Sequence, residues 1–298
     1  MTPRILSFIL TNMNKYQVIK GTGEIEDFSE HKLKRTLIQA GADQELEQEL
    51  VAEIEAAMKK QLTTQEIHQQ VYQFLKHHDP ASAARYNLRQ AVMELGPTGF
   101  PFEQFVASLL ANQGYTVETN KIVYGACVSH EVDIIAVKKN TRYMIECKYH
   151  NKRGSRSDIK TALYVWARFE DISEAWEKSK RVEEKIHEAW LVTNTKVSED
   201  AENYAKCRGL VVVSWYRPFR NSLKDMIVQT GLWPITCLSS LDDEGKKTLV
   251  EHNLVLCKDL LKLEKKDMKK LKVSNLNEAI KEAGFICDLP VIEADTRE

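Results

Sequence analysis

The fold of this 298-residue chain is decided by the stretch Glu131-Val-Asp-Ile-Ile-Ala-Val137, Lys138-Lys-Asn-Thr141, Arg142-Tyr-Met-Ile-Glu-Cys-Lys148. Two runs rich in β-branched and aromatic residues flank a polar Lys-Asn pair, a pattern that predicts a β-hairpin. A turn centred on Lys139-Asn140 puts Asp133 directly opposite Glu146, and Lys148 shares the face of Glu146. Opposed side chains in a hairpin have Cβ atoms about 5 Å apart, so this register brings two carboxylates and an amine together.

This grouping of charges indicates a metal-dependent hydrolytic site. Like charges opposed on a sheet repel each other, and a divalent cation removes that penalty. Mg²⁺ prefers carboxylate oxygens and usually takes only one or two from the protein. A bound metal polarises a phosphodiester and lowers the pKa of a coordinated water. Lys148 is placed to orient or help deprotonate that water, and the reaction that results is phosphodiester hydrolysis.

The Glu-x-Lys triplet by itself has little specificity. It also occurs at Glu30, Glu183, Glu244 and Glu264, in helical or capping contexts without an aspartate on a paired strand. An exposed hairpin whose charges are merely solvated is therefore the alternative to a catalytic site at this stage.

The segment around the hairpin alternates helix and strand, which predicts an α/β layer with a mixed central sheet. Gly96-Pro97-Thr98-Gly99 breaks the pattern before it and marks a domain boundary. The predicted helix is Glu103–Gln113, and the predicted strands are Tyr115–Glu118, Glu131–Val137, Arg142–Tyr149, Ala189–Thr193 and Leu210–Trp215.

The order of motifs in this segment resembles the PD-(D/E)xK nuclease superfamily, in particular its Mrr-like restriction endonuclease branch. The matching features are Phe102-Glu103 opening a helix that ends at Gln113-Gly114-Tyr115, then Val132-Asp133-Ile134, Ile145-Glu146-Cys147-Lys148, and Leu191-Val192-Thr193-Asn194 followed by Ala201 and Tyr204. The resemblance covers roughly 120 residues. It implies a restriction-endonuclease-like α/β/α domain over residues 98–220.

By that resemblance, Asp133, Glu146 and Lys148 are catalytic, and Glu103 is an accessory acid. Asp133, Glu146 and Cys147 are the metal-ligating positions, for Mg²⁺ or Mn²⁺. One departure from the family is the pair His130-Glu131, where many relatives have glycine; this pair could add a ligand or a substrate contact.

A basic segment surrounds the hairpin. Residues 138–156 hold seven Lys or Arg and a single acid, Glu146. Such an excess offsets the repulsion between carboxylates and phosphates, and it predicts DNA backbone contacts near Lys148, Lys152, Arg153 and Arg156. A solvated loop is the alternative for Lys152, Arg153 and Arg156.

The N-terminal segment, residues 15–95, reads as two short strands around Gly21-Thr22-Gly23, followed by amphipathic helices. The strands are predicted at Tyr16–Lys20 and Glu24–Phe28, and a helix follows Ser29 as its cap. Later helices are predicted at Gln44–Lys60, after a capping box at Thr63–Glu66, and from Pro80 onward.

This segment resembles the ATP-cone, a regulatory nucleotide-binding domain that is mostly helical with a small β cap. The matching features are Val18-x-Lys20-x-x-Gly23, Phe28, Lys32, Thr64-Gln-Glu-Ile67-His68, and Ala84-Arg85-Tyr86 with Arg89. The resemblance implies that Val18, Lys20, Lys32, Thr64 and His68 surround ATP or dATP. No Gly-x-x-x-x-Gly-Lys motif occurs in the sequence, so the nucleotide is expected to act as an allosteric effector.

Residues 221–298 read as short helices, loosely similar to small helix-hairpin-helix modules. Their Lys-rich joint at Lys258–Lys272 suits either DNA contact or docking of a partner.

The composition of the chain excludes several classes of protein. The net charge of −1 gives no global attraction to nucleic acid, no apolar run is long enough to cross a membrane, and the six cysteines are widely spaced without a CxxC pair. We therefore expect a cytoplasmic protein without a structural zinc site.

Two functions remain open at the sequence level. The first is a nucleotide-regulated, Mg²⁺-dependent DNA endonuclease, which the nuclease resemblance implies to be a homodimer or higher homo-oligomer. The alternative is a non-enzymatic, nucleotide-sensing DNA-binding regulator.

Overall fold

The computed structural model describes residues 16–20, 23–57, 61–152, 154–179 and 185–288. The chain divides into two compact units, Met1–Asn87 and Leu88–Glu298. This division is coarser than the three expected domains, whose boundaries stay predictions.

The first unit is a helical layer with a small sheet. Its elements are β1 (Gln17–Ile19), β2 (Ile25–Asp27), α1 (Glu30–Ala40), α2 (Gln44–Ala57), β3 (Leu62–Thr63), α3 (Thr64–His78) and most of α4 (Pro80–Met93). The sheet order is β2-β1-β3, with β1 antiparallel to β2 and parallel to β3. Its core consists of apolar residues at helical spacing, including Leu37, Leu50 and Val71, all fully buried.

Local sequence signals account for where these helices begin. The Ser29 side chain accepts a hydrogen bond from the backbone of Lys32 at the start of α1. Thr63 and Glu66 form the predicted capping box at the start of α3, which satisfies N–H groups that the helix leaves unpaired. The predicted helices and the two predicted strands of this unit are confirmed, and β3 is an addition. The Gly21-Thr22 part of the predicted turn and residues 58–60, the predicted end of the second helix, lie outside the described residues.

The second unit contains a five-stranded mixed sheet in the order β10-β8-β6-β5-β4. Strands β4, β5 and β6 are antiparallel neighbours, whereas β6, β8 and β10 run parallel. The elements are α5 (Phe100–Asn112), β4 (Thr116–Tyr124), β5 (Ser129–Lys138), β6 (Thr141–Lys148), β7 (Arg156–Ser157), α6 (Ile159–Ser179), β8 (Glu188–Thr193), β9 (Lys196–Val197), α7 (Glu199–Arg208) and β10 (Val211–Val213).

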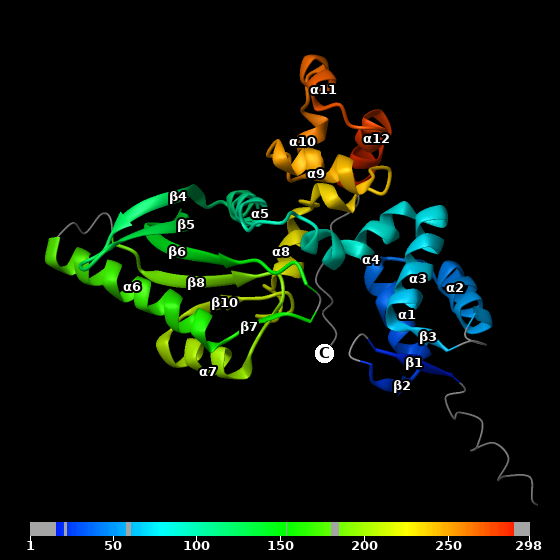
Figure 1. Cartoon of the computed structure of the whole chain (residues 1–298), viewed down its shortest axis with the longest axis horizontal. Helices are drawn as coiled ribbons and strands as arrows, with labels where there is room; N and C mark the ends of the chain where they lie inside the picture. The colour runs from blue at the N-terminus through cyan, green and yellow to red at the C-terminus, as the bar shows by residue number, and fades with distance from the viewer. Residues whose placement is uncertain (1–15, 21–22, 58–60, 153, 180–184, 289–298) are drawn as a thin grey trace, which may run out of the picture. The chain divides into compact units, whose positions relative to one another are not determined.

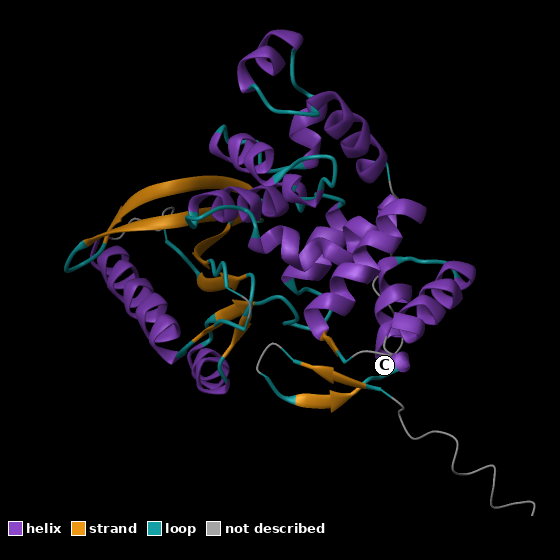
Figure 2. Ribbon diagram, turned by 45° about the vertical axis from the view of Figure 1, so that its right-hand side comes forward, coloured by secondary structure: helices purple, strands orange, loops and turns teal. Residues whose placement is uncertain are grey.

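Helices cover both faces of this sheet (Figures 1 and 2). Apolar residues of α6 and α7, among them Val165 and Ala201, form one core with Met144 and Leu191 of the sheet. Helix α5 packs against β4, β5 and β6 from the opposite face. The α/β/α architecture with a mixed sheet is therefore confirmed.

Several predicted boundaries in this unit shift: the strand predicted at Leu210–Trp215 is β10, Val211–Val213, and two other shifts have a clear local cause. Helix α5 begins at Phe100 rather than Glu103, because Pro101 occupies its first turn, where the missing N–H costs nothing. Strand β4 extends to Tyr124 rather than ending at Glu118, because it stays paired with β5 beyond Asn120, whose φ of 52° interrupts the regular backbone.

Short helices complete the second unit, as predicted. They are α8 (Leu223–Thr230), the single turn η2 (Ile235–Cys237), α9 (Asp243–Glu251), α10 (Cys257–Leu261), α11 (Lys265–Leu271) and α12 (Leu276–Cys287). None of the helices described here is long and apolar enough to span a membrane.

Candidate nuclease site

The hairpin of β5 and β6 has the predicted register. Its pairs run from Ile134 opposite Ile145 to Lys138 opposite Thr141, and the same register one residue further puts Asp133 opposite Glu146. Lys139 and Asn140 both have positive φ, at 49° and 64°, as a two-residue type I′ turn requires. The turn therefore fixes the alignment of the two acids.

The acidic side chains lie together where β5 and β6 meet. Asp133 Oδ2 accepts a hydrogen bond of 2.7 Å from the backbone N–H of Cys147. Burial raises the pKa of Glu146 to about 7, and the Asp133 carboxylate contributes to the rise. Burial likewise raises the pKa of Asp133, against the lowering effects of that hydrogen bond and of Arg168.

Glu103, on the first turn of α5, belongs to the same group. Burial and the Asp133 carboxylate raise its pKa, and its Oε2 lies 3.4 Å from the amide nitrogen of Asn120. Helix α5 thus brings a third acid to the two acids of the hairpin. Lys148 is exposed at the end of β6, where its charge lowers the pKa of Asp133.

Arg168 of α6 is a site residue that sequence reasoning missed. Its guanidinium is buried, donates to Glu146 Oε2 and donates to the backbone carbonyl of Glu131. This ion pair lowers the pKa of Glu146 and so opposes the effect of burial. The arginine lies 22 residues from the glutamate on a different element, and helical periodicity alone gives no sign of such a partner.

The donor set suits a magnesium ion. Among the described residues, no group of three or more His, Cys, Asp or Glu side chains could hold a metal ion. Mg²⁺ takes only one or two protein carboxylates and keeps waters or phosphate oxygens, which Asp133 and Glu146 satisfy. Burial raises the pKa of the Cys147 thiol well above its usual range, so this side chain stays a neutral thiol.

The ring of His130 contacts helix α6 rather than the acids of the candidate site. Its Nε2 lies 2.7 Å from Asp171 Oδ2 on α6. Asp171 also accepts hydrogen bonds from the backbone N–H groups of Cys127 and Val128. The departure at His130 therefore belongs to an anchor that ties the β4–β5 turn to α6.

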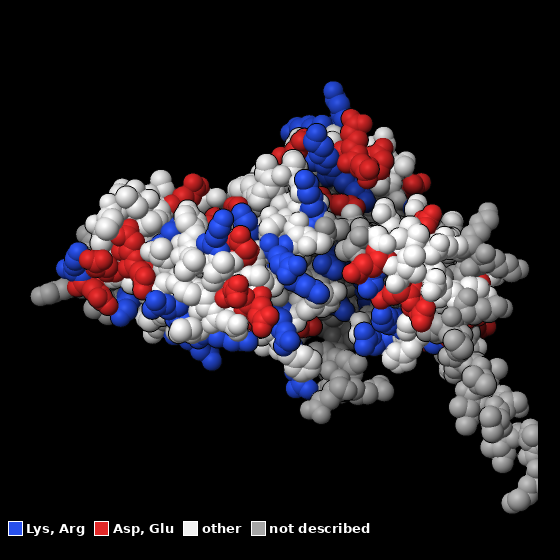
Figure 3. All heavy atoms as spheres, turned by 60° about the horizontal axis from the view of Figure 1, so that its bottom comes forward, with Lys and Arg blue, Asp and Glu red and all other residues white. Residues whose placement is uncertain are grey.

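Some of the basic residues predicted to contact DNA lie at the same end of the strands as the acidic side chains. Arg156 pairs with Lys196 in the short parallel sheet of β7 and β9. Lys152 is exposed, and Arg153 lies outside the described residues. Acidic and basic side chains are interspersed over the face that Figure 3 draws, so on this face any attraction to a phosphate backbone is local.

In the first unit, the structure brings four of the five predicted nucleotide residues to its small sheet. Lys20 and Lys32 both pair with Glu26 of β2, at 2.9 Å and 3.6 Å. Thr64 follows β3, which pairs with β1. Val18 of β1 is buried in the core, while His68 lies further along α3 and its ring packs 4.7 Å from that of Tyr86.

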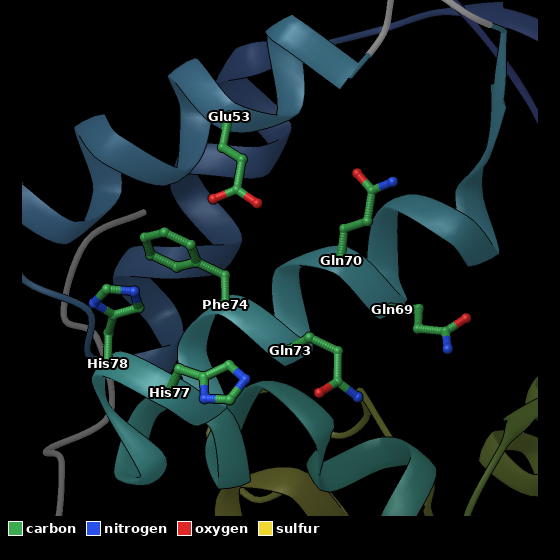
Figure 4. Close-up of a pocket in the computed structure, with 7 residues that line it drawn as sticks. All are labelled: Glu53, Gln69, Gln70, Gln73, Phe74, His77 and His78. Carbon is green, nitrogen blue, oxygen red and sulfur yellow. The ribbon is translucent and has the colours of Figure 1, made fainter.

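A separate hollow of about 490 Å³ lies between α2 and α3 (Figure 4). Its lining, as far as the structure describes it, is Glu53, Gln69, Gln70, Gln73, Phe74, His77 and His78. None of the predicted nucleotide residues is among these seven, so this hollow is distinct from the predicted site.

The fold and the order of acids define the class: a restriction-endonuclease-like nuclease domain joined to a nucleotide-binding module. Comparison with protein families agrees, since residues 16–91 match the ATP cone domain, residues 97–217 match the restriction endonuclease family and residues 233–287 match "AF1548-like, C-terminal".

The relatives show the family to which the chain belongs. An uncharacterized protein of Archaeoglobus fulgidus is 35% identical over 169 residues, which is 57% of this chain and 91% of that protein. A solved structure, described as a protein of unknown function, AF1548, has 34% identity and a TM-score of 0.53, over 64% of this chain and 98% of its own. The chain belongs to the family of these AF1548-like proteins.

Proposed function

We propose that this protein is a DNA endonuclease that hydrolyses phosphodiester bonds with Mg²⁺ or Mn²⁺ and is regulated by ATP or dATP. The observation that supports it best is the shared placement of Asp133 and Glu146 on one hairpin, with the Asp133 carboxylate bonded to the backbone between Glu146 and Lys148. The match to the restriction endonuclease family covers this hairpin.

Each residue then has a chemical role. Asp133 and Glu146 hold the ion, with the Cys147 carbonyl as a further oxygen donor. When bound, the ion polarises the phosphodiester and activates a water. Lys148 orients the water and stabilises negative charge on the phosphate. Glu103 adds a carboxyl group near Asp133, and Arg168 of α6 holds Glu146 in place through their ion pair.

Regulation is assigned to the first unit. Lysines beside a turn and a helix start suit a polyphosphate, because helix N-termini present free N–H groups. Lys20 and Lys32 already converge on one carboxylate, Glu26, which shows that their charges reach a common point. ATP or dATP bound there would bias the activity of the nuclease domain.

The test is cleavage of supercoiled plasmid and branched DNA with Mg²⁺ or Mn²⁺, in the absence and presence of ATP and dATP. We expect Asp133→Asn, Glu146→Gln and Lys148→Met each to lower the cleavage rate by at least about 100-fold, as loss of a positioned catalytic group does. Binding of the DNA by these variants separates loss of chemistry from loss of affinity.

A matched control exists in the same chain. Glu264 and Lys266 form another Glu-x-Lys triplet, exposed and paired at 2.7 Å beside α11. Glu264→Gln, which keeps every lysine of this joint, should leave the cleavage rate unchanged. Metal-dependent cleavage that survives Asp133→Asn and Lys148→Met would overturn the assignment, and DNA binding without any cleavage would favour the non-enzymatic regulator.

A further inference from the structure

The loop that follows β10 exposes two large aromatic rings that the proposed chemistry does not use. Its sequence is Ser214-Trp-Tyr-Arg-Pro-Phe-Arg-Asn-Ser222. Tyr216 is 51% exposed and Phe219 is 65% exposed, whereas the neighbouring Trp215 is only 3% exposed. Rings of this size normally dominate cores and interfaces, so the exposure of two of them in one short loop calls for a partner.

The loop that carries these rings is held by hydrogen bonds, so the exposure of the rings does not come from a weakly held backbone. The Ser214 N–H donates to the Arg217 carbonyl at 2.6 Å, and the Asn221 N–H donates to the Pro218 carbonyl at 3.3 Å. The Gln229 side chain donates to the Arg220 carbonyl from α8. With Trp215 buried beneath it, the loop holds both rings outward, and a ligand meets little further ordering cost.

The loop lies at the sheet edge that carries Lys148. Strands β6, β8 and β10 are parallel, so their carboxyl ends share one edge. Lys148 is paired with Thr193 at the end of β8, and the Trp215 N–H donates to Thr195 two residues later. Asn194 is bonded in both directions to the backbone of His150, which joins the segment after Lys148 to the segment before the loop.

Cations accompany both rings. The Arg220 guanidinium lies 5.3 Å from the centroid of Phe219. Tyr216 has the guanidinium of Arg89 at 5.7 Å and the ammonium of Lys196 at 5.9 Å. Aromatic rings with cations close to them suit a ligand with flat bases on an anionic backbone, because the cations can pair with the phosphates and leave the rings to stack on the bases.

We propose that the Trp215–Arg220 loop is a binding site for unpaired nucleotides, so that the substrate of this nuclease is DNA with a single-stranded segment, as in a gap, flap or junction. Tyr216 and Phe219 stack on exposed bases, and Arg217, Arg220 and Lys196 contact the adjacent phosphates. The inference rests on the proposed function, since it assigns the substrate class of the same edge of the sheet.

The test measures binding by the full chain in EDTA, where no metal-dependent cleavage occurs. The probes are fluorescent duplex DNA, the same duplex with a gap of about five nucleotides, and the single strand, with 2-aminopurine at an unpaired position. Each ring stacked on a base contributes roughly 1–3 kcal/mol, and 1.4 kcal/mol corresponds to a tenfold change. We therefore expect Tyr216→Ala and Phe219→Ala each to weaken binding of gapped DNA about tenfold and to restore 2-aminopurine fluorescence, with duplex binding unchanged.

Controls separate stacking from folding and from other surfaces. Tyr216→Phe and Phe219→Tyr keep the rings and should retain binding, and thermal unfolding checks that the alanine variants fold. Tyr124, 77% exposed at the end of β4, is a matched ring on the outer strand furthest from β10, and Tyr124→Ala should bind normally. Equal loss for duplex and gapped DNA, no loss, no binding of gapped DNA by the unmodified protein, or an altered oligomeric state as the sole effect would overturn the inference.

The two proposals fail separately. Ring-dependent binding of gapped DNA without cleavage in Mg²⁺ would keep the binding site and reject the nuclease. Cleavage without dependence on either ring would keep the nuclease and reject the binding site.

Discussion

Glu146 is both a proposed metal ligand and a largely buried carboxyl group, for which ionisation is unfavourable. Its carboxyl is mostly withdrawn from water beside Asp133, and its pKa rises from the ordinary 4.5 to about 7. The folded chain therefore binds a proton more tightly than the unfolded chain. The contribution to stability that this proton makes is complete below about pH 4.5 and is lost as the pH rises to about 7.

We predict that Glu146→Gln removes this part of the pH dependence. In EDTA, the free energy of unfolding of the unmodified protein should fall by up to about 3 kcal/mol between about pH 4.5 and about pH 7.5 because of Glu146, and the variant should lack this slope. Urea unfolding across this range measures it. Glu264→Gln, at an exposed site, should keep the slope; equal slopes in the unmodified protein and in Glu146→Gln would contradict the assignment.

Among the residues of the candidate site, the sequence predicts Asp133 and Glu146 but not Arg168. The positions of Asp133 and Glu146 follow from a two-residue turn and strict alternation, both of which are local. Arg168 reaches Glu146 only after α6 has packed on the sheet, and that packing depends on apolar residues elsewhere on the helix. Side-chain partners from distant elements are set by tertiary structure, which a single sequence does not display.

Among the elements, α6 does more than cover the sheet, because Asp171 on it holds the turn between β4 and β5. Gly125 leaves room for this contact: an added Cβ would lie 1.9 Å from the Asp171 carboxylate. Hydrogen bonding to His130 holds the pKa of Asp171 below its usual range, and Asp171 in turn raises the pKa of the exposed Cys127 thiol.

We predict that Asp171→Asn makes Cys127 react faster with a thiol reagent near neutral pH, since the loss of the carboxylate lets more thiolate form and frees the turn. The measurement is the labelling rate at Cys127 by mass spectrometry. Cys207, also exposed, serves as an internal control whose rate should not change. An unchanged ratio of the two rates would show that Asp171 does not govern this turn.

Elements with local signals were the ones that the sequence predicted well. The helix starts at Ser29 and Thr63 could be predicted from the sequence because a capping side chain bonds to the backbone only three residues further along. The short strands β3, β7 and β9 were missed because two residues carry no periodicity. The strand predicted through Trp215 ends at Val213, and the mixture of aromatic and basic residues that follows is a sequence signal for the loop.

For the whole molecule, two units bind two different ligands in our proposal. Ligand binding raises the stability of the unit that binds, by about 2.7 kcal/mol at a concentration of 100 times Kd. We predict that ATP or dATP slows amide hydrogen exchange in the first unit and that Mg²⁺ slows it around β5 and β6 in the second.

Paired variants make this prediction specific. Lys20→Ala should abolish the effect of nucleotide and keep that of Mg²⁺, and Asp133→Asn should do the reverse. If the nucleotide regulates the nuclease domain, its addition should also change amide hydrogen exchange in the second unit. Protection of the first unit by nucleotide that persists in Lys20→Ala would place the nucleotide elsewhere, for instance in the hollow between α2 and α3.

The order of the strands also bears on how the site assembles during folding. Asp133 and Glu146 come together through a tight turn within one hairpin, whereas β6 meets β8 only after the chain has passed through the whole of α6. Short-range contacts form faster than long-range ones because less chain entropy is lost in closing them. We therefore expect a newly made chain to bring its two negative charges together before Arg168 arrives to offset them, so divalent ions present at that stage would speed the maturation of the sheet.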